Sequence, residues 1–216
     1  QILIFERPQD TFFYIFQDLA VVPISVLIVT LILDQLLRIR EKRAMLKKMN
    51  MVIGAFFSEV GTMLLKVFPD FDLHYDKIRK NLIVTTEWSE REFSDVRNRL
   101  KSYDYKIESQ KGDLEDLKSF LIDKRDFLLG LLENPNLLEH ESFTDLLWAV
   151  FHLTEELVCR SNVKQLSVTD YAHLSGDIKR AYVLLISEWL AYMKHLKDTY
   201  PYLFSLAVRI NPFDPN

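Results

Sequence analysis

The sequence is poor in residues on which several common protein classes depend. It contains one cysteine in 216 residues, which excludes a disulfide framework and a cysteine-rich zinc module. Five glycines and seven prolines are too few for a turn-rich all-β fold. The net charge of −4 shows no basic excess of the kind that nucleic-acid binding requires. We therefore expect no nucleic-acid partner.

The motifs of the common enzyme classes are also missing from the sequence. Neither phosphate-binding glycine loop, GxxxxGK[ST] or GxGxxG, occurs, and there is no GxSxG or HExxH sequence. The aromatic residues follow helix-core spacing and do not alternate with basic residues. These absences favour a non-catalytic protein, for which we expect no cofactor.

The longest apolar run lies near the N-terminus, at residues 12–33. Among its 22 residues only Gln17, Asp18 and Pro23 are strongly polar or helix-bending. A helix needs about 20 apolar residues to cross the hydrocarbon core of a bilayer. The run therefore predicts a transmembrane helix over residues 12–36, with the lipid bilayer as a partner.

The charges that flank the apolar run predict its orientation. Six basic residues follow it closely, whereas Arg7 is the one basic residue before it. The positive-inside rule places the basic side in the cytoplasm, with its charges at the lipid headgroups. We expect a single-pass protein of the cell (inner) membrane, with residues 1–11 outside and a cytoplasmic domain over residues 37–216. The predicted membrane-surface residues are Arg38, Arg40, Lys42, Arg43, Lys47 and Lys48.

The cytoplasmic part is predicted to be all-α, a bundle of about five to six helices into which the transmembrane helix continues. The strand-like run at residues 82–86 is interpreted as a connector. Capping signals at Ser89, Asp113 and Ser167 mark helix starts, and Pro69 and Pro201 mark helix ends. The expected helices cover residues 46–67, 89–105, 113–132, 142–160 and 168–199.

The first of these helices has more apolar positions than one core-facing stripe needs. From Leu46 to Val67 its apolar residues follow a strict 3-4 spacing, and further apolar residues widen the stripe on both sides. We expect one side to face the bundle and the other to contact a second copy, or another subunit of a membrane complex. Two glycines seven residues apart would allow a close approach. The predicted interface consists of Leu46, Met49, Ile53, Gly54, Phe56, Val60, Gly61 and Met63.

Histidines and carboxylates cluster along two of the expected helices, at His152, Glu155, Glu156, His173 and Asp177. A His and a Glu three residues apart share a helical face, as in carboxylate metal bundles. The order here is reversed relative to the Glu-x-x-His motif of such bundles, and no second copy of the motif exists. A hairpin across residues 161–169 should bring His152 near Asp177, and His173 near Cys159. A metal or haem site at these residues is the alternative to an ordinary polar pair.

Two isolated residues receive structural interpretations. We expect Glu59, at the edge of the apolar stripe, to pair with a basic side chain, and Cys159 to be a buried thiol. The sequence as a whole predicts a membrane-anchored interaction or scaffold protein, or an accessory subunit of a membrane assembly. A helical metal- or haem-binding protein is the alternative, and a membrane-tethered signalling module is neither supported nor excluded.

Overall fold

The computed structural model describes residues 8–135, 137 and 140–214, and over these residues the protein is all-helical. Helices account for 78% of the chain, and the described residues form no strand. This confirms the predicted all-α class. The chain divides into two compact units, residues 1–48 and residues 49–216.

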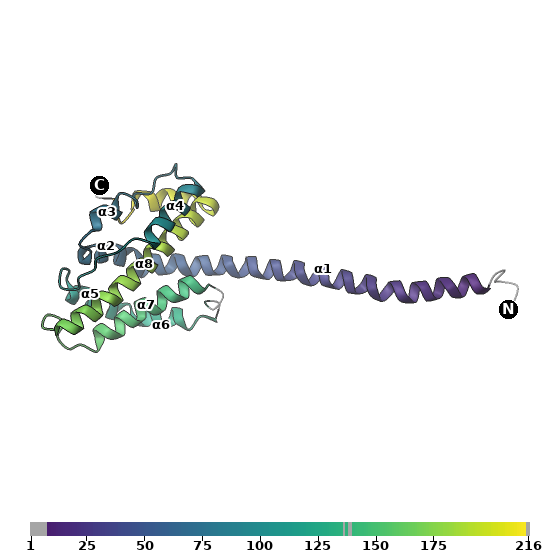
Figure 1. Ribbon diagram of the computed structural model, residues 1–216, viewed down its shortest axis with the longest axis horizontal. Helices are drawn as coiled ribbons and strands as arrows, with labels where there is room; N and C mark the ends of the chain where they lie inside the picture. The colour runs from purple at the N-terminus through teal and green to yellow at the C-terminus, as the bar shows by residue number, and fades with distance from the viewer. Residues whose placement is uncertain (1–7, 136, 138–139, 215–216) are drawn as a thin grey trace. The chain divides into compact units, whose positions relative to one another are not determined.

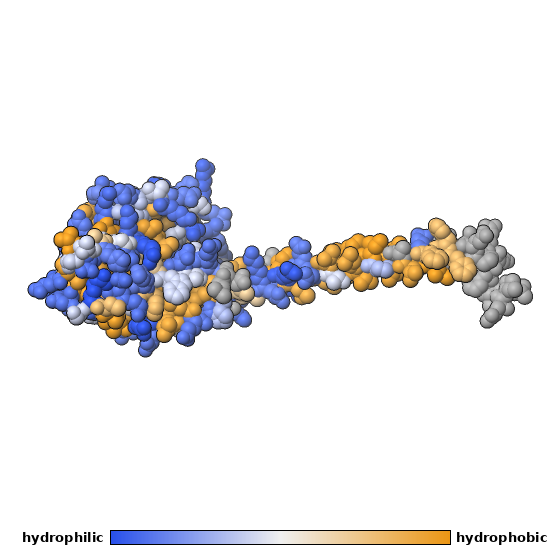
Figure 2. All heavy atoms as spheres, turned by 60° about the horizontal axis from the view of Figure 1, so that its bottom comes forward, coloured by the Kyte–Doolittle hydropathy of each residue, from blue (hydrophilic) through white to orange (hydrophobic). Residues whose placement is uncertain are grey.

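The first unit contains most of helix α1 (Pro8–Phe56). Apolar side chains follow one another along it, succeeded by hydrophilic ones (Figure 2). From Ile15 onward an 18-residue window of mean hydropathy 2.3 has none of its residues buried. The hydroxyls of Ser25 and Thr30 donate to backbone carbonyls one turn earlier, at 3.0 and 2.8 Å, so both polar groups are satisfied within the helix.

The second unit is built around the pair α7 (Glu141–Val158) and α8 (Val168–Thr199), which lie side by side (Figure 1). The chain enters this unit through the last residues of α1, a π-helical turn η2 (Phe57–Gly61), α2 (Thr62–Val67) and the 3₁₀ turn η3 (Phe68–Phe71). Helices α4 (Glu90–Lys101) and α9 (Pro201–Arg209) pack on α8, while α5 (Leu114–Asp123) and α6 (Arg125–Leu132) pack on α7. A short helix α3 (Tyr75–Arg79) precedes the connector at residues 82–86.

The capping signals in the sequence locate three helix starts correctly. Ser89 and Glu92 form the complete capping box of α4. The Asp113 carboxylate accepts two backbone N–H groups at the start of α5, and Ser167 caps α8. These contacts satisfy donors that the first helical turn leaves free.

Several helix bounds differ from the prediction, and the described part of the second unit has more helices than five to six. The helix predicted over residues 113–132 is broken at Lys124 into α5 and α6. Helix α4 ends at Lys101 rather than near Tyr105, whose side chain is buried outside the helix. Pro201 does not only end α8; it also starts α9, because proline fits the first turn of a helix.

The apolar stripe for which we predicted an interface belongs largely to the hydrophobic core of the second unit. Met49, Ile53, Phe56 and Val60 are at most 4% exposed within their own domain. The π-helical turn adds a residue to the helical repeat, so Phe57, Leu64 and Leu65 are buried as well. The surplus of apolar surface that motivated the predicted association is therefore covered by the second unit itself. Of the predicted interface residues, Leu46 and Met63 are exposed.

The two glycines of the stripe also make their close contacts inside the domain. A Cβ atom at Gly61 would lie 2.5 Å from Cδ1 of Phe57, and one at Gly54 would lie 3.0 Å from the hydroxyl of Tyr192. Glycine is needed at Gly61 because the neighbouring phenylalanine ring occupies the space of a side chain.

Candidate functional site

The strongest polar constellation lies between α7 and α8. His152 and Glu156 are one turn apart on α7, and His173 and Asp177 are one turn apart on α8, so each pair projects from one helical face. We call these four residues the His–carboxylate cluster. The sequence prediction that His152 lies near Asp177 is confirmed.

Both carboxylates of the cluster contact both imidazoles. Nε2 of His152 lies 3.5 Å from Oδ1 of Asp177 and 3.9 Å from Oε1 of Glu156. Nε2 of His173 lies 3.2 Å from Oδ2 of Asp177 and 3.4 Å from Oε2 of Glu156. One ligand atom from each of His152, His173 and Asp177 can be chosen so that all lie within 4.8 Å of one another.

The two carboxylates of the cluster have different environments. Glu156 accepts a hydrogen bond from Arg160 at 2.6 Å, which lowers the pKa of its carboxyl. Asp177 is 8% exposed, and its Oδ2 atom has no hydrogen-bond partner among the described residues. The guanidinium of Arg180 lies 4.0 Å from Oδ1 of Asp177. The cluster thus has one carboxylate that is held by arginine and one that is buried, whose Oδ2 atom lies 3.2 Å from Nε2 of His173.

One expectation about a neighbouring residue is wrong, because Cys159 is exposed rather than buried. His173 contacts Glu156 and Asp177. Glu155 stands outside the cluster, because its carboxylate accepts a hydrogen bond from Arg125 at 2.7 Å. Glu59 does pair with a basic residue, Lys124, at 3.4 Å.

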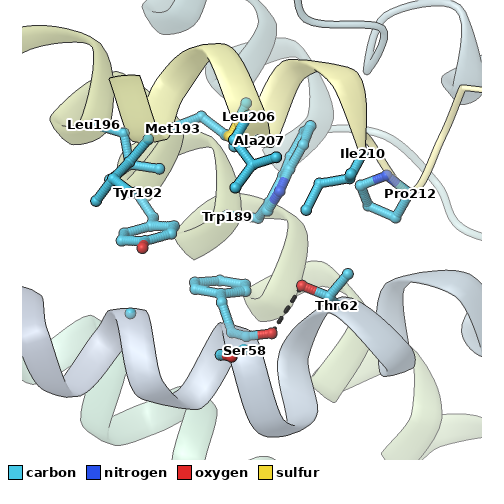
Figure 3. A pocket seen from close by; sticks show the side chains of 13 residues that line it. Ser58, Thr62, Trp189, Tyr192, Met193, Leu196, Leu206, Ala207, Ile210 and Pro212 are labelled. Carbon is cyan, nitrogen blue, oxygen red and sulfur yellow. Dashed lines mark hydrogen bonds between the residues drawn. The ribbon is translucent and has the colours of Figure 1, made fainter. Parts of the chain in front are cut away.

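A second feature is an apolar groove between the start of the second unit, α8 and α9. Its volume is about 270 Å³. Tyr192 of α8 points toward the helix that carries Ser58 and Thr62, and the Thr62 hydroxyl donates to the carbonyl of Phe57 at 2.7 Å (Figure 3). The ring of Tyr192 stacks on that of Phe57 at a centroid distance of 5.2 Å. This volume is below the range of typical ligand pockets and suits a few apolar side chains.

The rim of the groove carries exposed apolar side chains of α9 and the residue after it. Leu203, Leu206 and Ile210 line the groove and are 47–58% exposed. Residues 202–208 form a short apolar segment in the sequence. The groove itself could not be predicted from that segment, because the opposite wall of the groove comes from residues more than a hundred positions earlier. The alternation of apolar residues with Arg209 and Ser205 is the signal that could have indicated an exposed helical face.

Two family models match the chain. One is described as "Uncharacterized protein MJ1433, C-terminal helical domain" and matches residues 45–209, and the other as "MJ1433, N-terminal helical domain" and matches residues 1–37. The chain belongs to the MJ1433 family. The protein is similar to "Uncharacterized protein MJ1433" of Methanocaldococcus jannaschii, with 48% identity over 212 residues, which is 98% of this chain and 85% of that relative. No solved structure matches.

The family descriptions name helical domains and no activity, so they add no chemistry to either feature. They leave residues 38–44 between the two matched ranges. This interval holds four of the predicted membrane-surface residues. Arg38, Arg40, Lys42, Lys47 and Lys48 are exposed in the structure, and Arg38 pairs with Asp34 at 2.9 Å; the side chain of Arg43 lies outside the described set.

Proposed function

We propose that this protein is a non-catalytic, single-pass membrane protein whose helical domain self-associates beneath the bilayer. The observation that carries the anchor is the apolar helix segment from Ile15 onward, which is long enough to span and has no buried residue in its most apolar window. A core helix of the same composition would be covered by its own domain. The basic residues that follow it support a cytoplasmic location for the second unit.

The face around α9 supports a second copy as the partner. The same face offers a recess, with Trp189 and Tyr192 on one wall, and protruding apolar side chains, with Leu203 and Leu206 on the rim. Such a face is complementary to itself across a two-fold axis, because the protruding side chains of each copy can enter the recess of the other. Anchoring both copies in one membrane raises their effective concentration without any new contact.

The anchor is tested by membrane extraction of the full chain. We expect it to stay in the membrane fraction at high salt and at alkaline pH, and to be released by detergent. A variant that lacks residues 1–36 should be soluble and helical. Release of the full chain by high salt alone would contradict the anchor.

The self-association is tested by cysteine crosslinking in native membranes, in a Cys159→Ser background because Cys159 is exposed. Leu206→Cys should give crosslinked dimers of this chain. Val168→Cys is the matched control, because Val168 is 84% exposed and does not line the groove. Equal dimer yields at both positions, no dimer at Leu206, or adducts of Leu206→Cys with other proteins alone would contradict a second copy as the partner.

A further inference from the structure

The geometry of the His–carboxylate cluster points to a binding site for one divalent transition-metal ion, and we propose that His152, His173 and Asp177 bind it with Glu156 as a fourth ligand. This proposal is independent of the membrane anchor and of self-association. It concerns contacts between α7 and α8 within the second unit.

The distances within the cluster match the spacing of ligand atoms around a small cation. Bonds of about 2.0–2.2 Å to Zn²⁺ at tetrahedral angles place neighbouring ligand atoms about 3.3–3.6 Å apart. The four nitrogen–oxygen distances in the cluster are 3.2, 3.4, 3.5 and 3.9 Å. These distances involve both oxygens of each carboxylate, and ligand atoms taken one from each of His152, His173 and Asp177 lie within 4.8 Å of one another. The side chains would therefore have to move closer together to bind one cation.

The chemistry of the donors also favours a cation over a purely ionic contact. The two imidazole rings, with centroids 6.4 Å apart, both present Nε2 to the same two carboxylates. A divalent cation would be bound by the nitrogen lone pairs and the carboxylate oxygens together. It would also bind Asp177, whose buried Oδ2 atom makes no hydrogen bond among the described residues and lies 3.2 Å from Nε2 of His173.

The ligand set restricts which group can bind. Two imidazoles with one or two carboxylates suit Zn²⁺, Fe²⁺ and Mn²⁺. A haem does not fit, because both carboxylates stand within 3.9 Å of the same Nε2 atoms and leave no space for a porphyrin. The side chains of His152 and His173 are 42% and 52% exposed, so the ion can enter from solvent.

The two carboxylates of the cluster differ in how closely an arginine holds them. Arg160 holds Oε2 of Glu156 at 2.6 Å, and a metal would have to share or displace this contact. Arg180 lies 4.0 Å from Oδ1 of Asp177, too far for a strong hydrogen bond. We therefore expect Asp177 to contribute more to metal affinity than Glu156.

The test measures Zn²⁺ binding to the full chain in detergent, purified with a tag that contains no histidine and stripped with a chelator. A chromophoric chelator that competes for Zn²⁺ gives the stoichiometry and affinity. We expect one Zn²⁺ per chain. We expect His173→Ala and Asp177→Asn each to weaken binding at least about tenfold to a hundredfold, since the loss of groups that only support a ligand costs this much.

Glu155→Gln is the matched control, because Glu155 neighbours Glu156 in sequence but pairs with Arg125 outside the cluster. This variant should bind Zn²⁺ like the wild type. Absence of stoichiometric binding by the wild type would overturn the proposal, and so would affinity that is unchanged in both His173→Ala and Asp177→Asn.

Two further measurements keep the test decisive if a variant folds poorly. Co²⁺ bound to the wild type should show the visible absorption of a site with nitrogen and oxygen ligands, and X-ray absorption of the Zn²⁺ form should show histidine ligands. Zn²⁺ should also raise the melting temperature of the wild type and of Glu155→Gln, because an ion that binds only the folded state stabilises it. A Zn²⁺ spectrum without histidine would contradict the site.

Discussion

Phe56→Ala tests whether the apolar stripe is the core of the second unit or a contact between chains. Phe56 is fully buried, and its ring packs edge-to-face on Phe57 and on Phe143 of α7, each at a centroid distance of 5.4 Å. It therefore connects the first residues of the second unit to one of the two central helices. Truncation would leave a cavity between the two remaining rings.

The expected cost follows from this packing. Replacing a fully buried phenylalanine by alanine costs about 3–5 kcal/mol, because apolar contacts are lost and the cavity does not close completely. In a domain of 150–250 residues, 1 kcal/mol shifts the melting temperature by about 2–4 °C. We therefore expect Phe56→Ala to lower the melting temperature of the second unit by roughly 6–20 °C.

Thermal unfolding followed by tryptophan fluorescence in detergent measures the shift, since Trp189 is buried in the same unit. Met51→Ala, at a position that is 68% exposed, should change the melting temperature little. The loss in Phe56→Ala should be the same at protein concentrations that differ tenfold. A shift that varies strongly with concentration would place Phe56 in a contact between chains and refute the assignment to the core.

Two other predictions concern buried polar groups. Arg97 lies 3.8 Å from the carboxylate of Glu188, which is 2% exposed. Arg97→Ala should lower the free energy of unfolding by about 2 kcal/mol, which is less than the ~3–5 kcal/mol of a fully buried pair because Arg97 reaches solvent. Adding Glu188→Gln to the Arg97→Ala variant should restore part of this loss. Burial lowers the pKa of His195 below 6.5, so the folded state binds its proton less readily than the unfolded state. Its stabilising contribution is therefore complete above pH 6.5 and is lost as the pH falls through the folded pKa. The melting temperature should fall between pH 7 and pH 5 more in the wild type than in His195→Gln, and equal pH profiles would count against this role.

Much of the local structure could be predicted from single residues. Ser89, Asp113 and Ser167 precede apolar periodic segments, and their side chains can bond the first free N–H groups of a helix wherever that helix packs. The break at Lys124 could not be predicted in the same way, because the leucine pattern of α5 continues across it into α6. There the packing against α7 overrides the sequence pattern.

The sequence could not show which neighbour covers an apolar stripe. Met49, Ile53 and Val60 have the spacing of a contact helix, but the same spacing serves a helix that lies wholly inside a core. The π-helical turn at residues 57–61 turns additional apolar residues inward, and no simple residue pattern marks such a turn. The apolar residues that exceed the needs of a single core-facing stripe are therefore buried within one domain.

The residues of the His–carboxylate cluster could be found because all four follow helical spacing, in two pairs, on helices joined by a short connector. The contact of His173 with Glu156 was not predicted, although it follows from the same helix offset that brings His152 to Asp177. That offset depends on the path of residues 159–167 and on the packing of leucines between α7 and α8. Neither the path of this connector nor the packing of these leucines can be predicted from the spacing of the charged residues.

The proposed topology, in which the chain spans the membrane once with its helical domain in the cytoplasm, can be measured directly by thiol labelling of intact cells. Two single-cysteine variants, Gln9→Cys and Val168→Cys, are made in the Cys159→Ser background and treated with a membrane-impermeant maleimide. We predict that Gln9→Cys reacts on intact cells and that Val168→Cys reacts only after the membrane is permeabilised. Equal labelling of both positions on intact cells, or labelling of Val168→Cys alone, would contradict the account.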